Sequence, residues 1–238
     1  MAQTGNEDSL KQLGHVAFSD VEARARLSKG ASTLTVYRMV VHALSGRGIK
    51  GGTFVDFGCG SGQLFREVGP LFARCIGVDA AHYDGMPASA EFFQADLGSG
   101  RTQVPDSLGD VVASVETIEH LENPRALFRE LCRVAKPGGW IIVTTPNQLS
   151  FLSLATLLFK QQFNHFQQSS YPAHLTALLE IDLRRIASEC ELEEVSIEYS
   201  REGRIILTPW HYPRIFSRLF QRGCSDNVLL IGRKPQPV

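Results

Sequence analysis

The chain has 238 residues, with 24 lysines and arginines against 25 aspartates and glutamates, so its formal net charge is −1. Apolar residues make up 43% of it and charged residues 21%, which is ordinary for a globular enzyme. This balance lacks the positive charge of a general nucleic-acid binder and favours a small-molecule substrate. The five cysteines form no C-x-x-C pair, which argues against a disulfide framework or a zinc–thiolate site.

The sequence contains no segment typical of secretion or of a membrane span. Its N-terminal stretch, MAQTGNEDSLKQLGH, is polar. The most apolar run, residues 149–159, is far shorter than the ~20 residues that cross a bilayer. We therefore expect a cytoplasmic protein that folds as one domain over residues 1–238.

Two helices are predicted ahead of the first strand. Residues 20–29 and 33–44 carry apolar side chains at helical spacing, and the glycine-rich stretch 46–52 ends this pattern. We expect residues 18–46 to form a helical cap on the domain.

From residue 53 onward, short apolar runs alternate with helical segments. The predicted strands are 53–58, 75–80, 91–96, 110–116, 140–147, 193–200 and 227–233, and the predicted helices are 64–68, 124–135 and 175–189. Runs of Val, Ile and Phe without polar alternation are typical of strands that are buried on both faces. The pattern predicts a Rossmann-like, doubly wound α/β fold with a mostly parallel seven-stranded sheet and helices on both faces.

The helix at 124–135 carries signals at both of its ends. Asn123 can cap its N-terminus, and Pro124 suits its first turn. Gly138 and Gly139 suit its C-terminal end.

Residues 148–180 interrupt the alternation with a segment rich in Gln, Leu, Phe and His. Because this insertion follows a strand that flanks the expected site, we expect it to lie over the active site as a lid. Packing in the core and weak contact with a membrane surface are the alternatives. Tyr171, Trp210 and Tyr212 are candidates to line the same pocket.

A glycine-rich sequence, V-D-F-G-C-G-S-G-Q, follows the first predicted strand. Gly58 and Gly60 would let the backbone turn tightly and approach a ligand. Asp79 lies 21 residues beyond Gly58, where a carboxylate can accept both ribose hydroxyls of an adenosine cofactor. Asp96, at the end of the third strand, can accept the adenine amino group, with Leu97 supplying a backbone contact.

Four motifs occur in order over residues 50–147: D-F-G-C-G-S-G, G-V-D, A-D-L and K-P-G-G-W-I-I-V-T-T-P-N. In these motifs the chain resembles the class I S-adenosylmethionine (SAM)-dependent methyltransferases. The resemblance implies that the glycines border the methionine moiety and that Asp79 holds the ribose. It also implies that Asp96 and Leu97 hold the adenine and that the backbone of Val115 meets the methionine ammonium. The expected cofactor residues are Asp56, Gly58, Gly60, Asp79, Asp96, Leu97 and Val115.

The segment E-T-I-E-H directly follows the fourth predicted strand. In a helical turn, Glu116, Glu119 and His120 would lie at i, i+3 and i+4 and face one way. Together they could bind a divalent cation such as Mg²⁺, Mn²⁺ or Zn²⁺. Without a metal, His120 could act as general base or, with Glu119, position the acceptor. A purely structural role is the third alternative.

The E-x-x-E-H motif resembles that of two metal-using subgroups, the ubiquinone-pathway O-methyltransferases and the small-RNA 2′-O-methyltransferases. Both add a histidine from the region after the fifth strand, which implies His174 as a further metal ligand, with His165 as second candidate. Both methylate one of two adjacent hydroxyls. A metal bound to the two oxygens would lower the pKa of the acceptor and orient it.

These observations predict a SAM-dependent methyltransferase that acts on a hydroxyl oxygen of a small molecule. The first alternative is an RNA 2′-O-methyltransferase, which the near-zero net charge disfavours. The second is a non-catalytic SAM-binding protein, which the intact glycine loop and the E-x-x-E-H segment disfavour.

Overall fold

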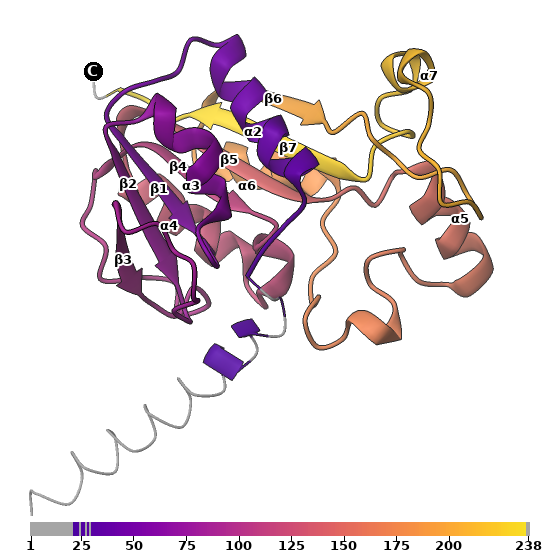
Figure 1. Cartoon of the computed structure of the whole chain (residues 1–238), viewed down its shortest axis with the longest axis horizontal. Helices are drawn as coiled ribbons and strands as arrows, with labels where there is room; N and C mark the ends of the chain where they lie inside the picture. The colour runs from indigo at the N-terminus through magenta and orange to yellow at the C-terminus, as the bar shows by residue number, and fades with distance from the viewer. Residues whose placement is uncertain (1–20, 24, 27, 29, 237–238) are drawn as a thin grey trace, which may run out of the picture.

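The computed structural model describes residues 21–23, 25–26, 28 and 30–236. A seven-stranded sheet with the order β3-β2-β1-β4-β5-β7-β6 forms its centre (Figure 1). The strands are β1 (Thr53–Phe57), β2 (Arg74–Asp79), β3 (Ala90–Gln94), β4 (Gly109–Val115), β5 (Ala135–Pro146), β6 (Glu193–Tyr199) and β7 (Asn227–Arg233). The first five strands pair in parallel, and β7 runs antiparallel to both of its neighbours. The expected mostly parallel, Rossmann-like sheet is confirmed.

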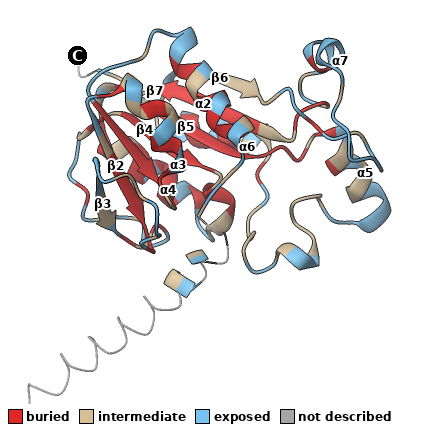
Figure 2. Cartoon of the chain, in the orientation of Figure 1, coloured by how far each residue is buried: buried red, intermediate tan, exposed pale blue. Residues whose placement is uncertain are grey.

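Helices cover both faces of this sheet (Figure 1). The α-helices are α2 (Leu34–Gly46), α3 (Gln63–Val68), α4 (Pro124–Val134), α5 (Phe151–Lys160), α6 (Glu180–Glu189) and α7 (Arg214–Leu219). Short 3₁₀ helices are η1 (Gly69–Leu71), η2 (Ile118–His120) and η3 (Gln168–Ser170). Successive side chains of β1 enter different cores, since Phe54 packs with α2 and α3 while Val55 packs with α4 and α6. The central strands β1, β4 and β7 are therefore buried on both faces, whereas the edge strands β3 and β6 are only partly covered (Figure 2).

The start of α4 agrees with the prediction, but the glycines predicted to end this helix lie within β5. Asn123 caps α4 as expected, because its side-chain oxygen accepts the N–H of Ala126 at 3.1 Å. However, α4 ends at Val134, and β5 begins at the next residue. Gly138, which has a φ of +75°, therefore lies in an irregular part of β5 and does not end the helix.

The helix predicted at 175–189 begins five residues late, at Glu180. The backbone N–H groups of Leu175 and Thr176 donate to the carbonyl oxygen of Glu119 at 2.9 and 3.0 Å. These bonds hold the segment before α6 against η2, and this segment has no regular secondary structure. A local sequence pattern could not predict them, because the partner is more than 50 residues away.

The predicted N-terminal cap and the predicted insertion each agree with the structure only in part. Residues 18–20, 24, 27 and 29 lie outside the described residues, so the first predicted cap helix is described only at 21–23 and 25–26, which are helical. The second predicted cap helix corresponds to α2. The insertion divides in two. Its helix α5 lies with α7 at one end of the molecule (Figure 1). Residues 169–174 instead line a cavity at the carboxyl edge of the sheet. No described helix combines the length and apolar character needed to cross a bilayer.

Because the apolar side chains of α4 are buried in the core, we expect their truncation to lower the free energy of unfolding strongly. Leu131 is fully buried on α4, whereas Leu158 on α5 is 76% exposed. We expect Leu131→Ala to lower the free energy of unfolding by ~2–5 kcal/mol. The control Leu158→Ala should change it by less than ~0.5 kcal/mol. Urea denaturation followed by circular dichroism measures both, and equal losses would contradict the assigned packing.

Candidate functional site

A cavity of about 950 Å³ opens at the carboxyl ends of β1, β2, β4 and β5. Ligands of open α/β sheets bind at this edge, because the loops after parallel strands diverge there. The expected cofactor residues that line the cavity are Asp56, Gly58, Asp79, Asp96, Leu97 and Val115. Gly60 is not among the lining residues. The glycine loop and the E-T-I-E-H segment thus share one cavity.

The two glycines of the loop have different neighbours. Gly58 has a φ of +82°, and a Cβ on it would lie 2.1 Å from Oγ1 of Thr117. Gly60 has a φ of +51°, and a Cβ there would lie 2.0 Å from the carbonyl oxygen of Gly30. The N–H of Gly60 donates to a carboxylate oxygen of Asp79 at 2.9 Å. Gly58 therefore shapes the cavity wall, while Gly60 fixes Asp79 and packs against the segment before α2.

Two aspartates at the ends of neighbouring strands are buried close together. Asp56 has a side-chain oxygen, Oδ1, without a hydrogen-bond partner among the described residues. Burial, followed by the charge of Asp79, raises the pKa of Asp56 to about 8. Burial also raises the pKa of Asp79, although N–H donors from Gly60 and Ala81 oppose this. A positively charged group of a ligand would stabilise the ionised form of both aspartates.

The remaining expected cofactor residues lie at the ends of β3 and β4. Asp96 is half-buried, and its carboxylate accepts the N–H of Gly98 at 2.8 Å. Leu97 is buried beside it. The carbonyl oxygen of Val115 accepts the hydroxyl of Thr117 at 3.2 Å. All of these groups face the same cavity.

Glu116 does not share a helical turn with Glu119 and His120, so the expectation that the three face one way is wrong. Its φ of +52° lies in the left-handed region, and η2 starts two residues later. Its carboxylate accepts the hydroxyl of Thr144 at 2.9 Å and the side-chain N–H of Asn227 at 2.8 Å. Glu116 thereby ties the end of β4 to β5 and β7.

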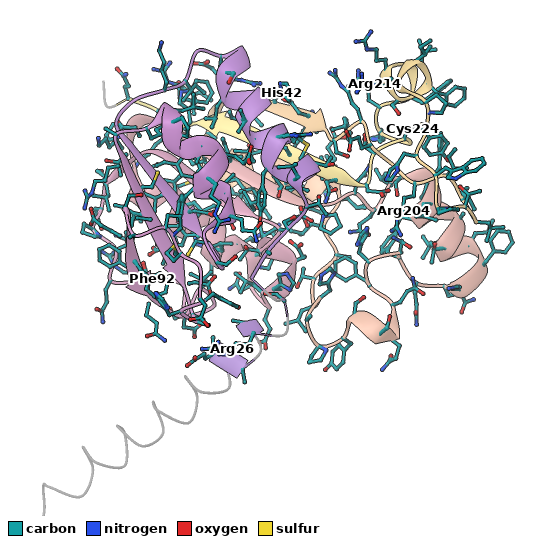
Figure 3. All side chains as sticks on the ribbon, in the orientation of Figure 1. Arg26, His42, Phe92, Arg204, Arg214 and Cys224 are labelled. Carbon is teal, nitrogen blue, oxygen red and sulfur yellow. The ribbon has the colours of Figure 1, made fainter. Side chains whose placement is uncertain are left out.

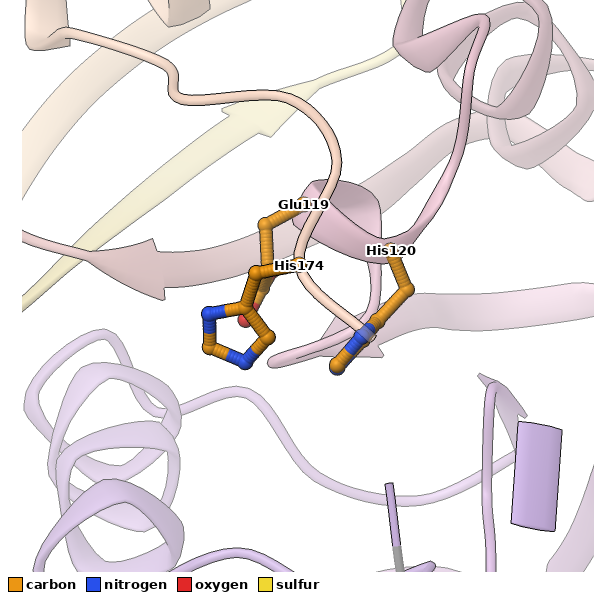
Figure 4. A group of neighbouring side chains, drawn as sticks. All are labelled: Glu119, His120 and His174. Carbon is orange, nitrogen blue, oxygen red and sulfur yellow. The ribbon is translucent and has the colours of Figure 1, made fainter. Parts of the chain in front are cut away.

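Glu119, His120 and His174 converge instead (Figure 4). One candidate ligand atom of each lies within 4.8 Å of the others. Glu119 is buried and accepts the hydroxyl of Thr145 at 3.2 Å. Nδ1 of His120 lies 2.6 Å from the carbonyl oxygen of Ala173, a partner that requires the proton on Nδ1 and leaves Nε2 free to accept. Nδ1 of His174 is buried without a partner among the described residues.

Burial dominates the electrostatics of this group. It raises the pKa of Glu119 to about 8 and lowers the pKa of His120. Burial and the nearby His120 lower the pKa of His174 to about 4. His165 stacks on His174 with ring centroids 6.4 Å apart and lies outside the converging group. The imidazoles are therefore neutral at pH 7, the form that accepts a proton or binds a metal.

Several residues that shape the site carried no signal in the sequence. Thr117 closes on Gly58, Thr145 holds Glu119, and the carbonyl of Ala173 orients His120. Each acts through a contact between distant segments, which no local spacing reveals. Tyr171 lines the cavity as expected, but Trp210 and Tyr212 do not, because they belong to the end of the molecule that carries α5 and α7.

A family model described as a methyltransferase domain matches residues 31–221, which is most of the chain. The chain therefore belongs to the class I SAM-dependent methyltransferases, which confirms the family predicted from the motifs and implies SAM as the methyl donor.

Individual relatives agree with this family. A protein from Mycolicibacterium smegmatis, named "Probable S-adenosylmethionine-dependent methyltransferase", is 30% identical over 119 residues, 49% of this chain and 44% of that protein. A "Ubiquinone biosynthesis O-methyltransferase" from Xanthomonas oryzae is 28% identical over 209 residues, 79% of this chain and 78% of that protein. The first match thus spans less than half of its relative. The crystal structure of a SAM-dependent methyltransferase from Archaeoglobus fulgidus shares the fold, with a TM-score of 0.59 and 19% identity over 83% of this chain and 94% of that one.

The contact at Gly58 predicts a specific loss of cofactor binding. We expect Gly58→Ala to weaken SAM binding at least about tenfold, because the new Cβ would displace Thr117 from the cavity wall. Gly85→Ala is the matched control: Gly85 also has a positive φ, +96°, but a Cβ there meets nothing within 4 Å. Calorimetric titration with SAM measures the affinity of each variant. If both variants lost affinity equally, the contact between the new Cβ and Thr117 would not be the cause of the loss.

Proposed function

We propose that this protein transfers the methyl group of SAM to a hydroxyl oxygen of a small-molecule acceptor. The observation that carries the proposal is the position of His120. Its imidazole lines the same cavity as Asp79 and Gly58, with Nδ1 fixed by the carbonyl of Ala173. A free imidazole nitrogen beside the cofactor loop suits removal of a hydroxyl proton.

The cofactor half of the proposal rests on the two buried aspartates. Asp79, held by the N–H groups of Gly60 and Ala81, has the position of a ribose-binding carboxylate. Asp56 has an unpartnered buried oxygen at the adjoining strand end. The ammonium and sulfonium charges of SAM would compensate this pair. Asp96 and Leu97 lie one strand further along, where the adenine would follow the ribose.

The transfer is a displacement at the methyl carbon. A lone pair of the acceptor oxygen forms the new C–O bond while the C–S bond breaks, and its electron pair stays on the sulfur of S-adenosylhomocysteine. The hydroxyl proton passes to Nε2 of His120. The methyl group of a sulfonium is already activated, so the protein mainly contributes alignment and proton removal.

A small-molecule acceptor is supported by charge and by similarity. The chain has a net charge of −1, whereas nucleic-acid binders concentrate positive charge on their binding surface. Relatives named as ubiquinone biosynthesis O-methyltransferases match as much as 79% of this chain. Both observations favour a small hydroxylated acceptor over RNA.

Replacement of His120 should separate catalysis from cofactor binding. We expect His120→Ala to lower kcat by about 10²–10⁴-fold, the usual contribution of a general base, with little change in SAM affinity. Asp79→Ala should instead weaken SAM binding. His42→Ala, on α2, is the matched histidine control. Release of S-adenosylhomocysteine from a panel of catechols, sugars and lipid-like phenols gives the rates, and unchanged turnover in His120→Ala would exclude its role as base.

A second form of the proposal includes a divalent cation at Glu119, His120 and His174. One carboxylate and two neutral imidazoles form a suitable donor set, and the buried Nδ1 of His174 has no hydrogen-bond partner among the described residues that would compete with a cation. A bound cation would supply Lewis-acid stabilisation of the acceptor oxygen. In that form His120 would be a ligand of the cation through Nε2, with its ring held by the carbonyl oxygen of Ala173, and would not act as base.

Direct metal binding distinguishes the two forms. If the second form holds, calorimetry with Zn²⁺, Mn²⁺ or Mg²⁺ should show one site, which Glu119→Gln or His174→Ala weakens by about 10-fold or more. Glu116→Gln is the control, because Glu116 lies outside the converging group. Absence of binding, together with turnover that EDTA leaves unchanged, would leave His120 as a base acting alone.

A further inference from the structure

Exposed apolar side chains gather at one end of the molecule, in α5 and in the segment around α7. We call residues 150–162 and 203–225 the distal lobe (Figures 1 and 2). Of the fifteen large apolar side chains that are exposed in the described part of the chain, twelve lie in this lobe. Six of them are 72–98% exposed, more than any outside it: Leu158, Phe159, Leu207, Trp210, Ile215 and Leu219. A concentration of this kind marks an interaction surface.

The distal lobe is fixed to the sheet at its base. Asn147, just beyond β5, donates through its side-chain N–H to the carbonyl oxygens of Arg222 and Ser225 at 2.7 and 2.8 Å. The N–H of Phe151 donates to the carbonyl oxygen of Gly223 at 2.8 Å. A row of ring contacts then joins α5 to α7, formed by Phe151, Tyr212, Phe216 and Phe220. The exposed side chains are thus presented by an ordered support.

Leu207 shows how strongly the lobe presents apolar groups to the outside. It lies in the turn between Arg204 and His211, which form an isolated antiparallel β-bridge, and it is 98% exposed. Its φ of +61° is in the left-handed region, which is unfavourable for a leucine. Within a single chain, neither burial nor backbone preference explains why a leucine occupies this position. An apolar environment outside the monomer would account for it.

The charge of the distal lobe has one sign. Its residues include Lys160 and four arginines, and no aspartate or glutamate. Arg204 and Arg222 form ion pairs with carboxylates at the lobe's border. Among the described residues, Arg214 and Arg218 form no ion pair and flank the exposed Ile215 and Leu219 on α7. Since the whole chain has a net charge of −1, this positive end is set against a negative remainder.

We propose that the distal lobe binds peripherally to the surface of an anionic lipid bilayer. Leu, Phe and Trp would enter the interface while arginine side chains meet the lipid phosphates, which is how interfacial segments divide their two kinds of group. A second copy of the chain fits less well. A two-fold interface places the same patch on both sides, and here it would bring arginines against arginines.

Vesicle binding tests the proposal on the full-length chain. We expect the protein to float with vesicles of phosphatidylcholine and phosphatidylglycerol in equal parts, and far less with phosphatidylcholine alone. Rising salt should weaken the binding, because the attraction to the surface is screened. Replacing Arg214 and Arg218 with Gln should lower the affinity roughly fivefold for each cation removed.

The apolar contribution is tested by Phe159→Asp, Leu207→Asp and Ile215→Asp. Each replaced side chain is exposed, so folding should be retained, whereas binding to the mixed vesicles should be lost. Ile181→Asp adds the same charge at an exposed apolar position on α6 and should leave binding unchanged. With Trp140 replaced by Phe, Trp210 becomes the single tryptophan, and its emission should shift to the blue on binding.

Three results would overturn the proposal. The first is a protein that stays unbound to the mixed vesicles at low salt, and the second is equal binding to neutral vesicles. The third is a dimer, detected by analytical ultracentrifugation without lipid, that the same aspartate substitutions dissociate. That result would assign the distal lobe to contact between two copies.

Discussion

Four carboxylates lie together at the carboxyl ends of β1, β2 and β4 and in η2; Asp56, Asp79 and Glu119 are buried, and Glu116 is half-buried. Burial is the main cause of the raised pKa of all four, and within the described part of the chain none of them forms an ion pair with a lysine or arginine. The two pairs meet this constraint differently. The glutamates receive protein hydroxyl and amide donors, whereas Asp56 keeps an oxygen without a partner. In the proposed function, the aspartate pair is therefore the part of the site that the positive charge of SAM would compensate.

The sequence predicted those features that depend on local pattern. Apolar runs placed all seven strands within a few residues, because strands buried on both faces leave little polar alternation. The glycine spacing located the loop, because Gly58 and Gly60 both adopt a positive φ at positions where a Cβ would clash with a neighbouring residue. Once the strands are parallel, their carboxyl ends meet, so the expected cofactor residues had to gather at one edge.

Features that depend on contacts between distant segments could not be predicted in this way. The helical spacing of E-T-I-E-H suggested one face for Glu116, Glu119 and His120. In the structure Glu116 also lines the cavity but does not join the converging group, because its backbone is left-handed and its carboxylate is bonded to Thr144 and Asn227. The length of α6 was overestimated for a similar reason. Its expected first turn is instead hydrogen-bonded to η2, and helical periodicity gives no indication of this.

The insertion after β5 belongs to the site as much as the strand ends do. The carbonyl of Ala173 orients His120, and the N–H groups of Leu175 and Thr176 bond to the carbonyl oxygen of Glu119. The same insertion begins with α5, which Phe151 and Gly223 anchor beside α7. One segment of chain thus runs from the distal lobe to the imidazole in the cavity. Because a carbonyl oxygen in this segment fixes the proton of His120 on Nδ1, the insertion determines which imidazole nitrogen of the neutral ring can accept a proton.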